Sequence, residues 1–175
     1  MENFWKKKKL SDFSEEEWES VCMRCGKCCL FKHSKNNKIY FTNHMCDGYD
    51  FKTGKCSRYT SRLGSTCTKV DMRLLYEEAE LLPETCAYRL LLAGKELPSY
   101  HPLVSGNPSS AHEAMQTVLE MPNIRSTTEI DKILNENLQV LCDENSTPEK
   151  NTEALAKLEN IRPIYIEIYD IPYLH

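Results

Sequence analysis

No stretch of this sequence approaches the roughly 20 apolar residues that a membrane-spanning helix needs. The first ten residues, Met1 to Leu10, are charged and are not followed by an apolar stretch, so they do not form a secretory signal. We therefore expect a cytoplasmic protein with no membrane span.

Catalytic motifs are missing as well. The sequence has no GxSxG, no HExxH and no glycine loop that would cradle a phosphate, and its 6 glycines leave little room for one. These absences argue against a hydrolase or transferase, and we assign no catalytic base. An activity that resides in a bound metal would leave no such motif, so enzymatic activity stays open and a non-enzymatic role is favoured.

Cysteine is what the sequence has in excess, with 9 residues, four of them in one short cluster. A gap of two residues lets one turn aim two sulfurs at a single ion, and this gap occurs twice, from Cys22 to Cys25 and from Cys25 to Cys28. Gly26 stands where such a loop often needs a positive φ. The side chains of Cys28 and Cys29 are expected to diverge, which favours two sites or one polynuclear cluster.

Four further cysteines precede residue 87, so the predicted metal ligands are Cys22, Cys25, Cys28, Cys29, Cys46, Cys56, Cys67 and Cys86. Reducing thiol pools in the cytoplasm disfavour disulfides and leave metal binding or redox chemistry as the usual uses of cysteine. Eight thiols suffice for two tetrahedral four-sulfur sites, with His44 as an alternative nitrogen ligand. Cys86 is expected at a helix N-terminus, which favours its thiolate. Cys142 lies in a distant helical pattern and is expected to be a buried apolar residue.

Charge is divided unevenly along a chain whose net charge is −4. Residues 1–70 hold 14 Lys and Arg against 8 Asp and Glu, whereas residues 71–175 hold 8 against 18. Basic side chains that could offset the negative charge of metal-bound thiolates are Arg24, Lys27, Lys55, Arg58 and Lys69. Nucleic-acid binding is not expected, because no basic recognition helix follows the cysteines and the acidic second half would repel phosphate.

Helix signals recur along the chain. A capping box at Ser14 predicts a helix from Glu15 to Val21, and Asp71 and Thr85 are expected to cap two more, the first ending before Leu82 and the second at Gly94. Ser126 begins another capping box, ahead of an amphipathic helix. A last helix opens with Pro148, with Leu155 and Leu158 facing inward.

Strand signals are fewer. Ile39 to Thr42 and the alternating run Ile164 to Tyr169 are predicted to pair as strands, whereas Lys32 to Lys38 is polar and rich in turn formers. The fold class is therefore α+β, a small cysteine-rich, metal-stabilised domain with short helices, few short strands and long ordered loops. We place a cysteine-cluster metal-binding domain at residues 1–112 and a mainly helical C-terminal extension, ending in a strand, at residues 113–175.

The chain resembles the bacterial YkgJ/YcgN-type cysteine-cluster proteins, a family described as zinc- or iron-chelating. The resemblance covers roughly residues 4–114 and includes Trp18-Glu19-Ser20 before the cluster, Ile39-Tyr40-Phe41-Thr42-Asn43 before Cys46, Cys56-Ser57-Arg58-Tyr59, Leu82-Pro83-Glu84-Thr85-Cys86-Ala87-Tyr88-Arg89-Leu90 and His101-Pro102-Leu103. It implies metal binding through the eight cysteines, all of which match the family pattern. The last sixty or so residues, which include Cys142, fall outside the resemblance.

Three hypotheses about function follow. The first is a metal-binding protein that holds zinc or iron through the eight clustered cysteines, in a structural role or as a carrier that delivers the metal to an unidentified protein partner. The second is an iron–sulfur electron-transfer protein or redox enzyme component, although Cys29 directly after Cys28 departs from the ferredoxin motif. The third is a thiol switch without metal, using low-pKa cysteines such as Cys28, Cys29 or Cys86. Spacing alone does not decide between zinc, iron and an iron–sulfur cluster.

Overall fold

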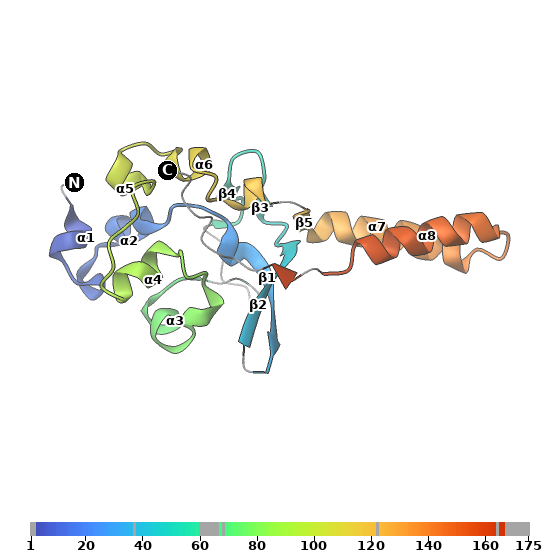
Figure 1. Cartoon of the computed structure of the whole chain (residues 1–175), viewed down its shortest axis with the longest axis horizontal. Helices are drawn as coiled ribbons and strands as arrows, with labels where there is room; N and C mark the ends of the chain where they lie inside the picture. The colour runs from blue at the N-terminus through green and yellow to red at the C-terminus, as the bar shows by residue number, and fades with distance from the viewer. Residues whose placement is uncertain are drawn as a thin grey trace.

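The structure is a computed structural model of the chain and describes residues 3–36, 38–59, 67, 69–121, 123–163 and 165–166. These residues form a mixed helix and strand fold, in agreement with the predicted α+β class. Figure 1 shows a body built of short elements, from which two longer helices, α7 (Thr127–Cys142) and α8 (Pro148–Asn160), project as a pair. Within the described ranges, no helix has the length and apolar character needed to cross a bilayer.

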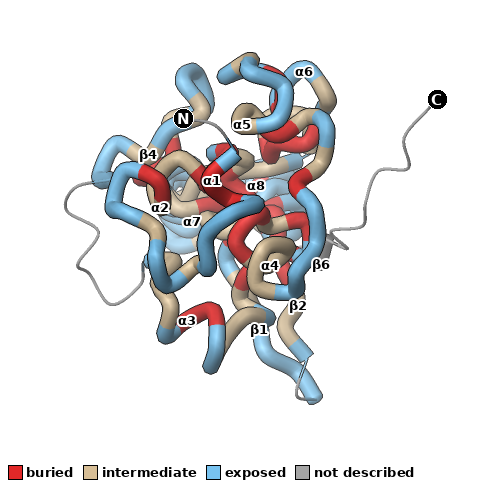
Figure 2. The backbone as a smooth tube through the Cα atoms, turned by 90° about the vertical axis from the view of Figure 1, so that its left-hand side faces the viewer, coloured by how far each residue is buried: buried red, intermediate tan, exposed pale blue. Residues whose placement is uncertain are grey.

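The helical part of the body surrounds the larger of two cores. Its elements are α1 (Phe4–Lys7), η1 (Leu10–Asp12), α2 (Glu15–Val21), α3 (Met72–Glu77), η4 (Ala79–Leu81) and α4 (Ala87–Leu92). This first core consists of Phe4, Trp5, Val21, Leu74, Leu75, Leu82, Ala87, Tyr88 and Leu97. Figure 2 shows buried backbone in α2, α3 and near α1, while the tip of the β1–β2 hairpin is exposed.

Helix α2 has the predicted bounds because its capping box forms. The Ser14 hydroxyl accepts a hydrogen bond from the Glu17 backbone amide at 3.2 Å, and the Ser14 amide donates to the Glu17 carboxylate at 2.9 Å. The same carboxylate forms an ion pair with Lys8 at 2.6 Å. The helix therefore ends at Val21 and delivers the chain directly to the first cysteine of the cluster.

Helices α3 and α4 differ from the prediction at two points. Asp71 caps α3 through the Leu74 amide, as predicted, but the α-helix ends at Glu77 and the chain continues as η4. The predicted cap Thr85 is wrong, because Cys86 occupies the N-cap position of α4. The Cys86 amide donates to the Pro83 carbonyl oxygen at 2.9 Å, which keeps Cys86 outside the helix. Gly94, at φ 68, follows the helix as expected.

A small sheet is centred on β2 (Lys38–Met45). It pairs antiparallel with β1 (Leu30–Lys35), parallel with β5 (Arg125–Ser126) and antiparallel with β6 (Tyr165–Ile166). The pairing of β6 with Phe41 and Thr42 confirms the predicted contact between the two strand regions, although residues 164 and 167–169 of the predicted strand lie outside the described part. The prediction of a polar turn region at 32–38 is wrong over most of its length, because β1 extends to Lys35.

The second core lies beside this sheet and consists of Leu30, Phe41, Met45, Tyr49 and Val118. Two short strands, β3 (Tyr49–Asp50) and β4 (Lys55–Cys56), form a separate antiparallel pair next to it. The loop after Pro98 contains α5 (Pro102–Ser105) and α6 (Ser110–Glu113), and η5 (Val118–Glu120) follows. Val118, which follows the predicted domain boundary at residue 112, therefore packs against the cysteine-rich part of the chain. The division into two domains at this boundary stays a prediction.

The C-terminal helices confirm the predicted elements but not all of the predicted burial. Ser126 caps α7 through the Glu129 amide, and Pro148 stands in the first turn of α8. The inward face of α8 carries the small residue Ala154, so Leu155 is 57% exposed and its predicted inward position is wrong. Cys142 is also exposed, which corrects its predicted burial: it is the last residue of α7, where the pair of helices has no core around it.

Candidate functional site

Eight cysteines line one cavity of about 800 Å³, and they are the eight predicted metal ligands Cys22, Cys25, Cys28, Cys29, Cys46, Cys56, Cys67 and Cys86. All nine cysteines lie in described residues, and no two of them form a disulfide. In the described part of the chain, no group of three or more His, Cys, Asp or Glu side chains is close enough to hold an ion. The sulfurs therefore face a common space without forming a finished tetrahedral site, and a bound ion would have to draw them closer.

The cavity lies between the two cores. Cys22, Cys28 and Cys86 pack against the first core, whereas Cys29 packs against the second. Two adjacent residues, Cys28 and Cys29, therefore pack against different cores. The cluster therefore ties together two small apolar cores, neither of which buries much surface on its own.

The cluster loop is shaped by two residues with positive φ, Arg24 at 57° and Gly26 at 75°. The predicted need for glycine at position 26 is confirmed, because a Cβ there would also lie 2.6 Å from a methyl carbon of Val118 and 2.8 Å from the ring of Tyr49. The Cys25 carbonyl oxygen accepts a hydrogen bond from the Val118 amide at 2.8 Å. The loop is thus held against the second core by contacts that only glycine permits.

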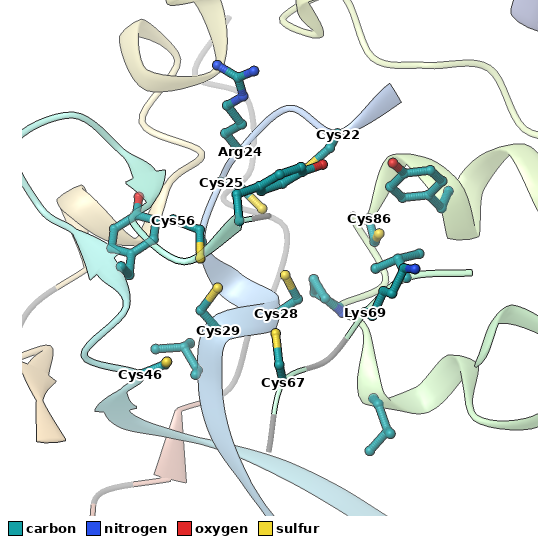
Figure 3. A pocket seen from close by; sticks show the side chains of 18 of the residues that line it. Cys22, Arg24, Cys25, Cys28, Cys29, Cys46, Cys56, Cys67, Lys69 and Cys86 are labelled. Carbon is teal, nitrogen blue, oxygen red and sulfur yellow. The ribbon is translucent and has the colours of Figure 1, made fainter. Parts of the chain in front are cut away.

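Two further cysteines reach the cavity from the strands that follow. At the end of β2, the Cys46 amide donates to the Cys29 carbonyl oxygen at 3.1 Å. The pairing of β3 with β4 places Cys56 opposite Tyr49. In Figure 3, Cys29, Cys46 and Cys56 lie on one side of the cavity and Cys22 and Cys86 on another, with Cys28 near the centre.

Burial favours the protonated form of the Cys22, Cys25 and Cys86 thiols. Burial raises the pKa of Cys22 to about 12 and that of Cys25 to about 11, and the charge of Cys28 adds to both shifts. Burial likewise raises the pKa of Cys86, although amides at the start of α4 oppose the shift. The predicted stabilisation of the thiolate by the helix N-terminus is therefore present, but burial outweighs it.

The side chains of Cys28 and Cys29 do not diverge as expected. A hydrogen bond between their thiols, together with burial, raises the pKa of Cys28 well above the ordinary value for cysteine. The two thiols therefore meet at the point where the cluster passes from one core to the other.

The positive charge nearest the sulfurs comes partly from a residue that the sequence did not single out. Lys32 lines the cavity on β1, and its ammonium group donates to the carbonyl oxygens of Cys28 at 2.7 Å and Leu30 at 3.0 Å. Burial lowers the pKa of Lys32, while the charges of the neighbouring cysteines oppose that shift. No sequence motif indicates that Lys32 lies near the cysteines, because β1 falls in a polar stretch that was predicted to form turns.

The predicted basic residues differ in their relation to the cluster. Lys27 is only 4% exposed, and its charge lowers the pKa of Cys25 against the effect of burial. Arg58 is exposed and forms an ion pair with Asp47 at 2.7 Å. In Figure 3 the Arg24 guanidinium points away from the sulfurs, whereas Lys69 lies near Cys86. Lys55 also lines the cavity.

Tyr49 brings a buried hydroxyl to the cavity wall. Its side chain is only 6% exposed, and among the described residues the hydroxyl has no hydrogen-bond partner. Burial and the charges of nearby cysteines, Cys25 first, raise the pKa of this phenol. A neutral donor is thus available within the cavity.

His44, the predicted alternative ligand, and two further histidines contact groups other than the sulfurs. His44 Nε2 lies 2.9 Å from the Ile161 carbonyl oxygen, and His101 Nε2 lies 2.9 Å from the Val21 carbonyl oxygen. His112 forms an ion pair with Glu120 at 2.6 Å. None of the three lines the cysteine cavity, so its donor set consists chiefly of soft sulfur atoms, which suit zinc and iron.

Comparison with known proteins identifies relatives over about two thirds of the chain. A UPF0260 protein of Haemophilus influenzae is 46% identical over 118 residues, which cover 64% of this chain and 76% of the relative. A UPF0260 protein of Aliivibrio fischeri is 43% identical over 121 residues, covering 67% and 82%. A UPF0260 protein of Pasteurella multocida is 43% identical over 118 residues, covering 64% and 79%. No protein-family model matches the chain, and no solved structure does so either.

Proposed function

This chain belongs to the UPF0260 family, and we propose that it is a metal-binding protein that holds zinc or iron through its eight clustered cysteines. One observation carries the proposal: cysteines from positions 22 to 86 converge on a single cavity, and none of them is used in a disulfide. Unrelated buried thiols would be scattered over the two cores. The resemblance to the YkgJ/YcgN-type proteins, described as zinc- or iron-chelating, points to the same chemistry.

Metal binding at this site should depend on pH, because the cysteine thiols must lose their protons to bind. The buried thiols of Cys22 and Cys25 are neutral at pH 7, and a metal binds only thiolates, so binding must release protons. The affinity for metal therefore rises with pH. Lys27 and Lys32, both close to the cluster, reduce the negative charge that four thiolates around a divalent ion would leave.

The metal would supply either crosslinks among the segments that carry the cysteines or, as an iron–sulfur cluster, a carrier for one electron. A crosslink suits the small size of the cores, because the metal can stabilise what apolar burial alone does not. We place the protein in a structural or metal-carrier role on this ground.

The test is metal analysis of the full chain purified without oxygen, together with its absorption spectrum. We expect about two zinc ions per chain and no visible absorption, or iron with acid-labile sulfide and a broad visible band that reductant bleaches. Cys25→Ser should lose metal, whereas the matched control Cys142→Ser should retain it, because Cys142 is exposed at the end of α7. A wild-type chain that is folded but holds no metal would overturn the proposal.

A further inference from the structure

The eight cysteines divide between the two cores. Three of them, Cys22, Cys28 and Cys86, pack against the first core, which has nine buried residues. Cys29 packs against the second core, which has five. The cavity wall thus consists of two parts that pack against different cores, and the two parts meet at Cys28 and Cys29.

Cys25 joins the first part through its side chain, although its carbonyl oxygen is hydrogen-bonded to the Val118 amide of the second core. It shares the two-residue gaps with Cys22 and Cys28, which pack against the first core. Figure 3 shows the Cys25 side chain beside Cys22. One turn of the cluster therefore supplies three sulfurs to the same part of the cavity, and α4 supplies the fourth.

Cys46 and Cys56 belong with Cys29. The Cys46 amide is hydrogen-bonded to the Cys29 carbonyl oxygen at 3.1 Å, and the Gly48 amide donates to the Cys46 sulfur at 3.4 Å. Tyr49, a member of the second core, is the β-ladder partner of Cys56. These contacts fix three cysteines around the second core.

Cys67 completes this second part. Figure 3 shows its sulfur below those of Cys28 and Cys29, on the opposite side of the view from Cys22 and Cys25. Cys67 is exposed, and the residues around Cys56, namely Lys55, Ser57, Arg58 and Tyr59, are exposed as well. The second part of the cavity is therefore more open to solvent than the first.

We propose, on the basis of the proposed metal binding, that the chain holds two ions at different depths. An inner site of Cys22, Cys25, Cys28 and Cys86 retains its ion, and an outer site of Cys29, Cys46, Cys56 and Cys67 exchanges its ion with solvent or a partner. The inner ion crosslinks the cluster to the first core, and the outer ion is the one available for delivery. Each site has four thiolates, the usual number for tetrahedral zinc.

The experiment loads the full chain with Zn²⁺ and follows its release to an excess of a chromogenic chelator. The wild-type chain should release one equivalent rapidly and one at least tenfold more slowly. Cys67→Ser should remove the fast equivalent only, and Cys25→Ser the slow one only. The double variant with Cys25→Ser and Cys86→Ser should lose no more zinc than Cys25→Ser alone, whereas Cys25→Ser with Cys67→Ser should lose both equivalents.

Two matched measurements keep the outcome clear. Circular dichroism checks that each variant is folded, and Cys22→Ser and Cys56→Ser stand in for an inner or outer variant that is insoluble. A wild-type chain that binds zinc while either Cys25→Ser or Cys67→Ser alone loses all of it indicates one shared cluster and overturns the division, with metal binding intact. Equal release rates for the two ions overturn the difference in depth. A wild-type chain that holds iron but no zinc overturns this inference alone, whereas a folded wild-type chain that holds neither metal also overturns the proposed function.

Discussion

His101 Nε2 lies 2.9 Å from the carbonyl oxygen of Val21, the residue immediately before the first cysteine of the cluster. The ring is completely buried, and its Nδ1 accepts a hydrogen bond from the Leu103 amide at 3.1 Å. Since Nδ1 accepts, the proton is on Nε2, which donates to Val21. A residue 80 positions further along the chain thus fixes the end of α2 and the start of the cluster.

Removing this ring should destabilise the fold. His101→Ala leaves the Val21 carbonyl and the Leu103 amide without a partner and creates a cavity, so we expect a loss of about 2–4 kcal/mol in the free energy of unfolding. Chemical denaturation measures it. His33→Ala is the matched control, because His33 is exposed on β1, and it should change stability by less than about 0.5 kcal/mol. Equal effects of the two substitutions would contradict the structural role of His101.

The same ring predicts a dependence of stability on pH. Burial lowers the pKa of His101, so below the ordinary histidine value of about 6.5 the unfolded chain binds a proton that the folded chain does not. The stability that His101 contributes is therefore full above that value and decreases as pH falls. The difference in unfolding free energy between wild type and His101→Gln should narrow as pH is lowered from about 8 to about 5. A difference that widens over this range would refute the prediction.

Local sequence signals predicted those parts of the fold that depend on neighbouring residues. The capping box at Ser14, the cap at Ser126 and the glycine at position 26 all act within a few residues, and the structure has each of them. The pairing of β6 with β2 also followed from a pattern, the alternation of apolar residues. The eight cysteines were predicted as one set of ligands from their number and from the family resemblance, and all eight line one cavity, whereas their metal binding stays a prediction.

Long-range packing explains what the sequence did not predict. Strand β1 was missed because its outer residues are exposed and polar, so Lys32 was not recognised as a neighbour of the cluster. Burial of Trp5 depends on contacts with Phe4 and on a core completed near Leu97, far along the chain. Leu155 is exposed because α7 and α8 approach each other through the smaller Ala154. None of these contacts leaves a periodic pattern in the sequence.

Tyr49→Phe tests the buried hydroxyl in the cavity wall. With no partner among the described residues, this hydroxyl costs stability in the metal-free chain, so its removal should raise the free energy of unfolding by about 1 kcal/mol. Urea denaturation with a chelator present measures the change. Tyr76→Phe, on the exposed side of α3, is the control and should have no effect. A loss of stability in Tyr49→Phe would mean that the hydroxyl donates a hydrogen bond in the folded chain.

Thiol reactivity separates Cys142 from the other eight cysteines. In the metal-loaded chain, about one thiol should react rapidly with a disulfide reagent, because Cys142 is exposed and outside the cavity while metal-bound thiolates are protected. Cys142→Ser should abolish this rapid phase. A chelator should then make the remaining eight accessible in both proteins. Several rapid thiols before the chelator is added would show that the clustered cysteines are not protected by metal.

Two glycines with the same backbone conformation separate steric crowding from backbone strain. Gly26 and Gly94 have φ values of 75° and 68°, yet a Cβ would meet Val118 and Tyr49 at position 26 and no atom within 4 Å at position 94. Gly94→Ala should therefore cost only the left-handed conformation, about 1 kcal/mol. Gly26→Ala adds overpacking and should cost about 2–4 kcal/mol in all. Because Gly26 lies between Cys25 and Cys28, Gly26→Ala should also speed zinc release, whereas Gly94→Ala should leave it unchanged. Equal unfolding free energies for the two variants would show that the cluster loop can accommodate a side chain at position 26. The contact of this loop with the second core would then not hold the cysteines in place.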